Sequence, residues 1–284
     1  MDILGLIPPL DLAGPAEAAT ADMAAGGSAF FDALQQAGDN VHYEMVGLLE
    51  ALPPELFLLA MAALAFFTGR KKYGFLAFVI FGLWLIDNQD MWNPFMETLA
   101  LVLSAGAVSA AAGIPLGIVM AKSKTASAVM APVLDFMQTM PAFVYLIPAV
   151  AFFGIGVVPG IFASVMFALP PVVRMTALGI RQVPEELEEA ADAYGSTPWQ
   201  KLLKLELPLA MPSIMAGLNQ TVMMALSMVV IASMIGAPGL GRDVLAALQR
   251  AQVGQGFVAG LGIVIMAIMV DRFTQRLGKG GSRR

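Results

Sequence analysis

Long apolar segments constrain this chain more than any other feature of its sequence. Residues 223–235, for example, are apolar on nearly every face of a helix and contain no charge. A bilayer interior cannot satisfy open backbone hydrogen bonds, so a spanning segment must be a helix of about 20 apolar residues or a strand of a closed barrel. Barrel strands alternate apolar and polar residues, and these segments do not. With 58% hydrophobic and 13% charged residues among 284, the chain is predicted to be an all-α membrane protein.

Seven apolar segments predict about seven transmembrane helices. They are centred on residues 56–67, 73–86, 98–121, 129–153, 160–180, 213–235 and 256–270. The first two and the last are shorter than the roughly 20 residues that span a bilayer. These three need flanking residues or a locally thinner membrane.

The positive charges predict the orientation, because cytoplasmic loops are enriched in Lys and Arg. If the N-terminus lies outside, most basic residues fall on the cytoplasmic side, with Arg174 near it: Arg70, Lys71, Lys72, Lys122, Lys124, Arg181, Lys201, Lys204, Arg272, Arg276, Lys279, Arg283 and Arg284. Only Arg242 and Arg250 fall outside. We therefore expect the N-terminus out and the C-terminus in.

An acidic tail precedes the first span. Residues 1–54 carry acidic side chains, Asp2 and Asp11 among them, but no Lys or Arg, which is unlike the positively charged start of a signal peptide. Apolar residues between positions 30 and 52 recur at helical spacing and predict an amphipathic helix. Two placements stay open for it, the membrane surface or the surface of the protein itself.

The titratable side chains exclude several classes of site. The lone His42 is predicted to be a surface residue, and a single histidine excludes an HExxH zinc site. The absence of cysteine excludes disulfides and thiolate metal sites. The net charge of -5 argues against nucleic acid as a partner.

A polar island at residues 181–208 separates two predicted spans on the cytoplasmic side. Gly195 can adopt the left-handed conformation that ends a helix. Thr197 can cap a second helix that has Pro198 at its first position, and residues 207–208 are predicted to end that helix. The island is thus predicted to form two short helices.

The same island reproduces the EAA motif of ABC importer permeases, which reads EAA, three residues, G, nine residues, I, one residue, LP. The matching residues are Glu189, Ala190, Ala191, Gly195, Leu205, Leu207 and Pro208. Leu205 is the one departure, since it replaces an isoleucine. Small side chains let a partner approach the helix backbone closely. The resemblance implies that this loop, within residues 181–210, couples the chain to ATPase subunits.

Further stretches resemble the permeases of glycine betaine, proline betaine and choline importers. They are residues 135–148, 167–171, 207–212, 219–220 and 227–236. The resemblance implies a type I importer core in residues 95–284, preceded by an acidic extracytoplasmic tail (1–54) and two accessory transmembrane helices (55–94). It implies a multi-pass protein of the bacterial inner membrane that pairs with a second copy of itself. It also implies two ATPase subunits that bind ATP and Mg²⁺, an extracytoplasmic solute-binding protein, and no cofactor in this chain.

Polar and aromatic residues within the spans are candidates for the translocation pathway, because aromatic faces hold quaternary ammonium groups. These candidates are Gln138, Thr139, Phe143, Tyr145, Asn219, Gln220 and Ser227. For the polar ones, bonding between helices is the favoured alternative. Asp135 is expected to pair with Lys124. An outer loop containing Gly236, Gly239 and Gly241 is predicted to shape a gate or to contact the binding protein, or else to be a simple turn.

The chain has no GxxxxGK[ST] phosphate loop, so an ATP-driven transporter would need a partner ATPase. Three rival functions stay open beside that one. An ion-gradient secondary transporter would show ionisable residues at mid-membrane or interrupted repeats, and neither is clear. An intramembrane enzyme would need a nucleophile with a base, or a metal triad. The third rival is a structural anchor for the ATPase.

Overall fold

The computed structural model describes residues 13–68 and 73–280, and within these ranges the chain forms helices and no strand. The all-α class is therefore confirmed. The N-terminal helices are α1 Ala13–Gly26, α2 Ser28–Glu50, α3 Pro54–Thr68 and α4 Tyr73–Asn88. The remaining elements are α5 Trp92–Lys122, α6 Lys124–Thr139, η2 Ala142–Tyr145, α7 Leu146–Phe153, α8 Val157–Arg181, α9 Glu185–Ala193, α10 Pro198–Lys201, η3 Leu202–Glu206, α11 Leu207–Ala232, η4 Ser233–Ile235, α12 Leu240–Gln249 and α13 Val253–Gly280. The predictions for Asp2, Asp11, residues 70–72, Arg283 and Arg284 lie outside the described residues.

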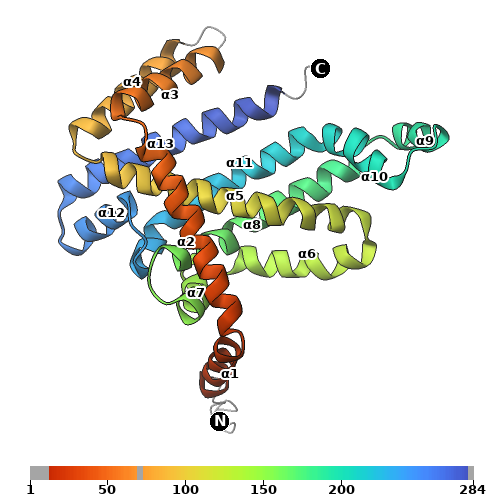
Figure 1. Ribbon diagram of the computed structural model, residues 1–284, viewed down its shortest axis with the longest axis horizontal. Coiled ribbons are helices and arrows are strands. Elements are labelled where there is room, and N and C mark those ends of the chain that lie inside the picture. Colours follow the sequence, from red (N-terminus) through yellow and green to blue (C-terminus); the bar gives the residue numbers. More distant parts are fainter. Residues whose placement is uncertain (1–12, 69–72, 281–284) are drawn as a thin grey trace, which may run out of the picture.

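Four helical stretches among the described residues are long and apolar enough to cross a bilayer. They are Trp92–Lys122, Val157–Arg181, Pro198–Ile235 and Val253–Gln275, and they contain the four predicted segments 98–121, 160–180, 213–235 and 256–270. In Figure 1, α5, α8 and α11 run side by side through the middle of the molecule, and α13 lies beside α11. These helices form the core of the fold.

Small residues bring α5 and α8 into close contact. A Cβ atom added at Gly117 of α5 would lie 2.5 Å from Thr176 Cβ and 2.7 Å from the carbonyl oxygen of Val173 on α8. On α11, a Cβ at Gly217 would lie 2.6 Å from Met175 Cβ. Helix association in membranes depends on such small residues, because lipid tails leave no hydrophobic drive between helices. The three helices therefore pack as one unit.

The predicted span at residues 129–153 is broken in the structure. Helix α6 and the η2–α7 segment meet at a bend of 110°. Met140 and Pro141 both have extended backbones at the bend, with ψ angles of 134° and 139°. Proline disfavours the helical conformation in the residue before it and supplies no N–H donor, which explains the break at this position.

The first two predicted spans are short helices in the structure. Helix α3 has 15 residues and follows α2 at a bend of 91°, and α4 has 16 residues. Both are shorter than the roughly 20 residues that cross the hydrocarbon layer. The count of seven spans and the orientation in the membrane stay predictions.

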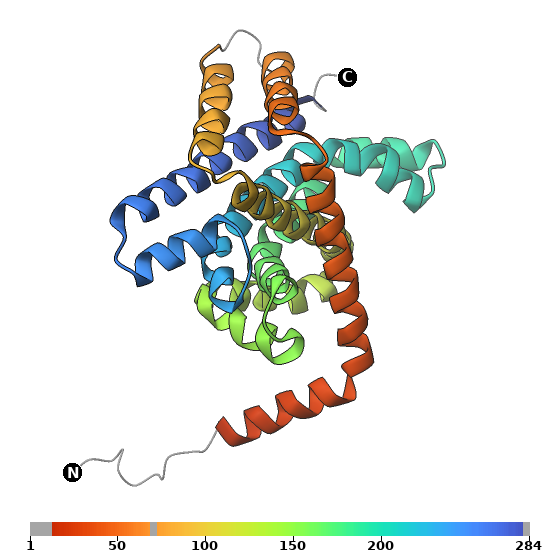
Figure 2. The same cartoon turned by 60° about the vertical axis from the view of Figure 1, so that its left-hand side comes forward.

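The amphipathic helix α2 packs on the protein. It crosses α5 and α8 (Figures 1 and 2). The ring of Phe31 stacks on Phe152 at a centroid distance of 4.6 Å, and a Cβ atom at Gly38 would lie 3.1 Å from Val158. The prediction that His42 is a surface residue is wrong: its side chain is buried, because it lies on the inner face of this helix. Packing on the protein is thus the alternative that the structure favours for this helix.

Most basic residues in the described part of the chain lie at one end of the helical core. The α5–α6 connection, the α9–α10 pair and the last turns of α13 lie at this end, and α7 and α12 lie at the other (Figure 1). Lys122, Lys124, Arg181 and Arg272 are exposed at the first end, whereas Arg250 ends α12 at the opposite end. This distribution is the one that the positive-inside rule requires of the predicted orientation.

Candidate functional site

Two short helices, α9 and α10, project from the basic end of the molecule (Figure 1). Gly195 follows α9 with a φ of +76°, a left-handed conformation that glycine adopts without strain. The N–H of Gly195 donates to the Asp192 carbonyl at 2.9 Å, and the N–H of Ser196 donates to the Ala191 carbonyl at 3.0 Å. Gly195 therefore ends α9, as the sequence predicts.

Helix α10 begins with a capping box. The Thr197 hydroxyl accepts a hydrogen bond from the backbone of Gln200, whose side chain accepts one from the N–H of Thr197. The Lys201 ammonium lies 2.9 Å from Asp192 Oδ2 and 3.6 Å from Glu188 Oε2, both on α9. These ion pairs join the two helices across the turn, so that α9 and α10 form one rigid pair.

The prediction that residues 207–208 end the second helix is wrong. The chain passes from α10 through a single π-helical turn, η3, in which the N–H of Leu207 donates to the Leu202 carbonyl, and continues directly into α11. Pro208 directly follows this turn and lacks the N–H that would continue the backbone hydrogen bonds, so the π-helical turn is the local irregularity that accompanies it. Residues Pro198–Ile235 form one continuous helical stretch of 38 residues.

The α9–α10 pair exposes both the motif residues and large apolar side chains. Glu189 and Ala190 are exposed and Ala191 is half-buried. Tyr194 is 92% exposed and Trp199 is 67% exposed, with Leu187 and Leu203 also at the surface. Sequence reasoning missed these four side chains, although large apolar residues in a polar loop were the available signal. Exposed apolar groups on a polar element indicate a protein contact surface.

A buried ion pair lies directly behind this element, and sequence reasoning missed it as well. Glu206, in the η3 turn, has a fully buried side chain, and its Oε2 atom lies 2.5 Å from the Nζ of Lys122 at the end of α5. Among the described residues, neither oxygen of this carboxylate accepts a hydrogen bond of good geometry. Lys122 is therefore the group that compensates the buried charge.

A second ion pair corrects the expected partner of Asp135. Its Oδ1 atom lies 2.5 Å from a guanidinium nitrogen of Arg174 on α8, and not beside Lys124. Lys124 begins the same helix as Asp135, three turns away, whereas α8 packs alongside α6. At the C-terminal end of α8, the guanidinium of Arg181 donates a hydrogen bond to the Met120 carbonyl of α5 at 2.5 Å.

The candidate pathway residues divide into exposed and packed groups. Gln138, Thr139, Phe143, Gln220 and Ser227 are exposed, and Gln220 and Ser227 lie on one stripe of α11 because they are seven residues apart. Tyr145 is instead buried, and its hydroxyl donates to the Met137 carbonyl. The exposed group stays available to line a pathway.

Asn219 takes part in a polar network between α11 and α13. Its amide nitrogen donates to Asp271 Oδ1 at 3.0 Å, and its amide oxygen accepts from the Thr274 hydroxyl. Gln275 donates to the same carboxylate at 2.7 Å. The favoured interpretation, bonding between helices, therefore describes the position of Asn219.

Asn219→Leu should affect mainly stability, and Gln220→Leu should affect mainly transport. We expect Asn219→Leu to lower the unfolding free energy by about 1–3 kcal/mol, because it leaves the half-buried Asp271 with fewer donors. Gln220→Leu should leave stability unchanged, since its side chain is exposed, but should reduce uptake if this stripe lines the pathway. Thermal unfolding in detergent measures the first effect, and uptake after reconstitution of the same variants into proteoliposomes measures the second. Equal destabilisation by the two variants would contradict the assignment.

The glycine loop at the other end of the bundle is a packed turn. Gly236 and Gly239 have positive φ angles of 93° and 101°, and a Cβ atom at Gly239 would lie 2.3 Å from Thr98 Oγ1. Thr98 accepts a hydrogen bond from the N–H of Leu240 at 2.8 Å. Gly241 is buried against the backbone of Val229. Close packing of the loop on α5 and α11 is therefore what requires glycine there.

Residues 113–280 match the family described as binding-protein-dependent transport system inner membrane component. This match covers more than half of the chain, including the α9–α10 pair and the continuous helix that follows it. The chain belongs to this family. It is thus a multi-pass transport subunit of the inner membrane, and the resemblance stated from the EAA motif is confirmed.

The permease has relatives with high identity. The glycine betaine/carnitine transport permease protein GbuB of Listeria monocytogenes serotype 1/2a (strain 10403S) is 58% identical over 234 residues, which cover 82% of this chain and 83% of that protein. The glycine betaine transport system permease protein OpuAB of Bacillus subtilis (strain 168) is 48% identical over 248 residues, which cover 87% of each chain. Such relatives are permeases and not enzymes, and they give no support to an ion-gradient transporter.

The solved structure of a methionine ABC transporter, MetNI, in an inward-facing conformation, has the same fold. One of its chains superposes with a TM-score of 0.61 at 21% identity, over 68% of this permease and 96% of that chain. The similarity confirms the type I importer fold predicted for the core.

Proposed function

We propose that the permease forms half of the pore of an ATP-driven importer for glycine betaine and related quaternary ammonium solutes, including proline betaine and choline. The observation that carries this proposal is the 58% identity with a glycine betaine/carnitine permease over most of both chains. The exposed Phe143 and Phe136 supply aromatic faces, which suit a cation that has no N–H to donate.

The coupling part of the proposal rests on the geometry of the α9–α10 pair. Two partner ATPase subunits bind ATP and Mg²⁺, and each would contact one copy of the permease. The contact surface would be formed by Leu187, Glu189, Tyr194 and Trp199. Small side chains at Ala190, Ala191 and Gly195 let that partner approach the backbone, and no heavy atom lies within 4 Å of a Cβ atom added at Gly195. Closure of the ATPases would move the pair and, through η3, helix α11.

The remaining partners follow from the same assignment. A second copy of the permease completes the pore, membrane lipid surrounds it, and an extracytoplasmic binding protein delivers the solute near the loop of Gly236, Gly239 and Gly241. Residues 95–284 act as the permease core, and residues 1–54 and 55–94 act as an extracytoplasmic tail and an accessory pair of helices. The alternative source of energy, an ion gradient, is distinguished from ATP by the uptake experiment below.

Uptake into proteoliposomes tests the proposal. The permease is reconstituted with its cognate ATPase and binding protein, and the entry of labelled glycine betaine, carnitine and choline is compared. We expect glycine betaine uptake that requires ATP on the side of the membrane where the ATPase lies. This uptake should persist when a protonophore collapses the proton gradient. Uptake that continues without ATP and stops with the protonophore would contradict the proposal.

A further inference from the structure

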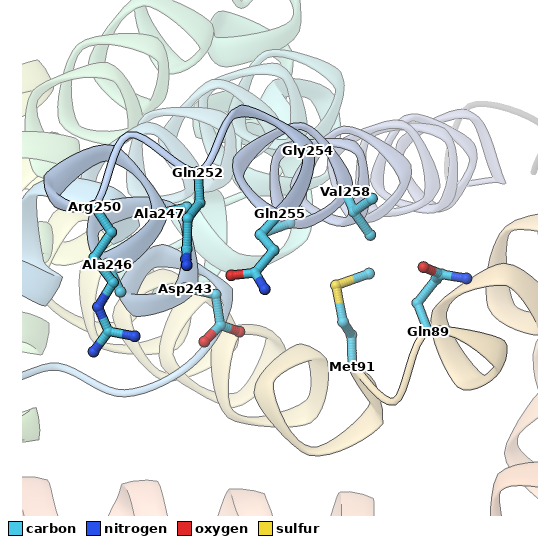
Figure 3. Close-up of a pocket in the computed structure, with 11 residues that line it drawn as sticks. Gln89, Met91, Asp243, Ala246, Ala247, Arg250, Gln252, Gly254, Gln255 and Val258 are labelled. Atoms are coloured by element: carbon cyan, nitrogen blue, oxygen red, sulfur yellow. The ribbon is translucent and has the colours of Figure 1, made fainter.

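A polar pocket opens at the predicted extracytoplasmic end of the permease, between α12, the start of α13 and the turn from α4 to α5 (Figure 3). Its volume is about 430 Å³. In Figure 3, Gln252 and Gln255 reach toward Asp243 of α12, and Gln89 and Met91 face them from the α4–α5 turn. The pocket thus gathers polar groups from segments that are far apart in the sequence.

The two charged side chains of the pocket, Asp243 and Arg250, belong to no ion pair among the described residues. Burial raises the pKa of Asp243, and the neighbouring Arg242 only partly opposes that rise. A raised carboxyl pKa means that the charged form lacks stabilisation, which a ligand cation would supply. A carboxylate that is only partly compensated and a guanidinium without an ion pair among the described residues complement a ligand that carries both charges.

An apolar groove continues from this pocket between α4 and α13. Its volume is about 260 Å³, and it shares Gln89, Met91 and Val258 with the polar pocket. The rest of its lining is apolar: Leu85, Ile86, Phe257, Leu261, Gly262 and Ile265. The combined site therefore has a charged head and a hydrophobic tail.

The surface of the bundle beside the groove is apolar, as a lipid-facing surface would be. Phe257 is 70% exposed and Val264 is 52% exposed on α13, so the uncovered part of this helix is apolar. Trp92, which follows Met91 of the pocket, is half-buried at the start of α5, and tryptophan is typical of the membrane–water interface. Helices α4 and α13 lie across α5 and α11 from α6 and α7 in Figures 1 and 2.

We propose that the pocket and groove together bind one zwitterionic phospholipid of the outer leaflet. Its phosphate pairs with Arg250, its ammonium group pairs with Asp243, and one acyl chain lies between α4 and α13. A soluble betaine would leave the apolar groove empty, and an anionic phospholipid would leave the Asp243 carboxylate without a cation. The site is separate from the α9–α10 pair, which lies at the opposite end of the molecule (Figure 1).

Photolabelling tests this site. The full-length permease is placed in nanodiscs that contain phosphatidylethanolamine with a diazirine in one acyl chain, and labelled peptides are mapped by mass spectrometry. We expect labels concentrated in residues 85–91 and 257–265. Arg250→Gln should reduce this labelling about tenfold, because a hydrogen bond to a charged group is lost. Val258→Trp, which fills the shared wall, should reduce it as well.

Matched controls separate the site from general lipid contact. Arg272→Gln removes an exposed arginine from the other end of α13, and Ile268→Trp enlarges an exposed side chain of the same helix outside the residues expected to be labelled; both should leave the labelling unchanged. Full labelling of Arg250→Gln and Val258→Trp would overturn the proposal. It would also fail if a diazirine-tailed phosphatidylglycerol labelled the same peptides equally, or if free glycine betaine displaced the lipid.

Discussion

Replacing Lys122 with methionine should cost the permease about 3 kcal/mol of stability and most of its transport. The carboxylate of Glu206 is fully buried with its Oε2 atom 2.5 Å from Lys122 Nζ, so the substitution would leave this charge without its cation. Removing one partner of a buried ion pair costs about 3–5 kcal/mol, and the partial exposure of Lys122 places the cost at the lower end. Transport should fall because the pair joins the end of α5 to the turn between α10 and α11. Thermal unfolding in detergent and ATP-driven uptake measure the two effects.

Two further variants control this experiment. Lys124→Met removes an exposed lysine that has no ion pair among the described residues, and should change neither measurement. The double variant Lys122→Met, Glu206→Gln should regain much of the lost stability, because it removes the uncompensated charge together with its former partner. A double variant no more stable than Lys122→Met alone would show that the ion pair is not the cause.

Gly195→Asp should abolish solute-stimulated ATP hydrolysis in the assembled transporter while the permease stays folded. The φ of +76° costs an aspartate only about 1 kcal/mol, and no heavy atom lies within 4 Å of the new Cβ atom. The carboxylate would instead enter the surface where we propose that the ATPase sits. The measurement is ATP hydrolysis with and without the loaded binding protein, together with co-purification of the ATPase.

Gly26→Asp is the control for this substitution. Gly26 is exposed at the end of α1, has nothing within 4 Å of an added Cβ atom, and lies far from the α9–α10 pair (Figure 1). We expect this variant to retain its ATPase on purification. Unchanged stimulation in Gly195→Asp, or equal loss of the ATPase in both variants, would remove the coupling role from the α9–α10 pair.

The sequence predicted the parts of the fold that depend on local chemistry. The four long helices follow from continuous apolar runs, and the end of α9 at Gly195 and the start of α10 at Thr197 follow from backbone preference and capping. The loop that we propose as the coupling element was recognised by the spacing of its small and acidic residues. In each case the determining residues lie within a few positions of one another.

The remainder of the site depends on contacts between distant segments. The pairing of Glu206 with Lys122, and of Asp135 with Arg174, requires knowledge of which helix faces which. His42 was predicted to be a surface residue because it lies in the acidic tail, and the contact of α2 with the core buries it. The continuation of α10 into α11 was missed because Leu207 followed by Pro208 is typical of a helix end, and the π-helical turn before this proline has no signal in the sequence.

That continuity has a mechanical consequence. A helix of 38 residues is roughly 57 Å long, since each residue adds about 1.5 Å. If the ATPases tilt the α10 end by about 5°, the η4 end sweeps through about 5 Å, close to the rise of one helical turn. A small tilt at the cytoplasmic end would thus become a displacement of several ångströms at the far end, provided that the π-helical turn η3 and Pro212 within α11 do not bend.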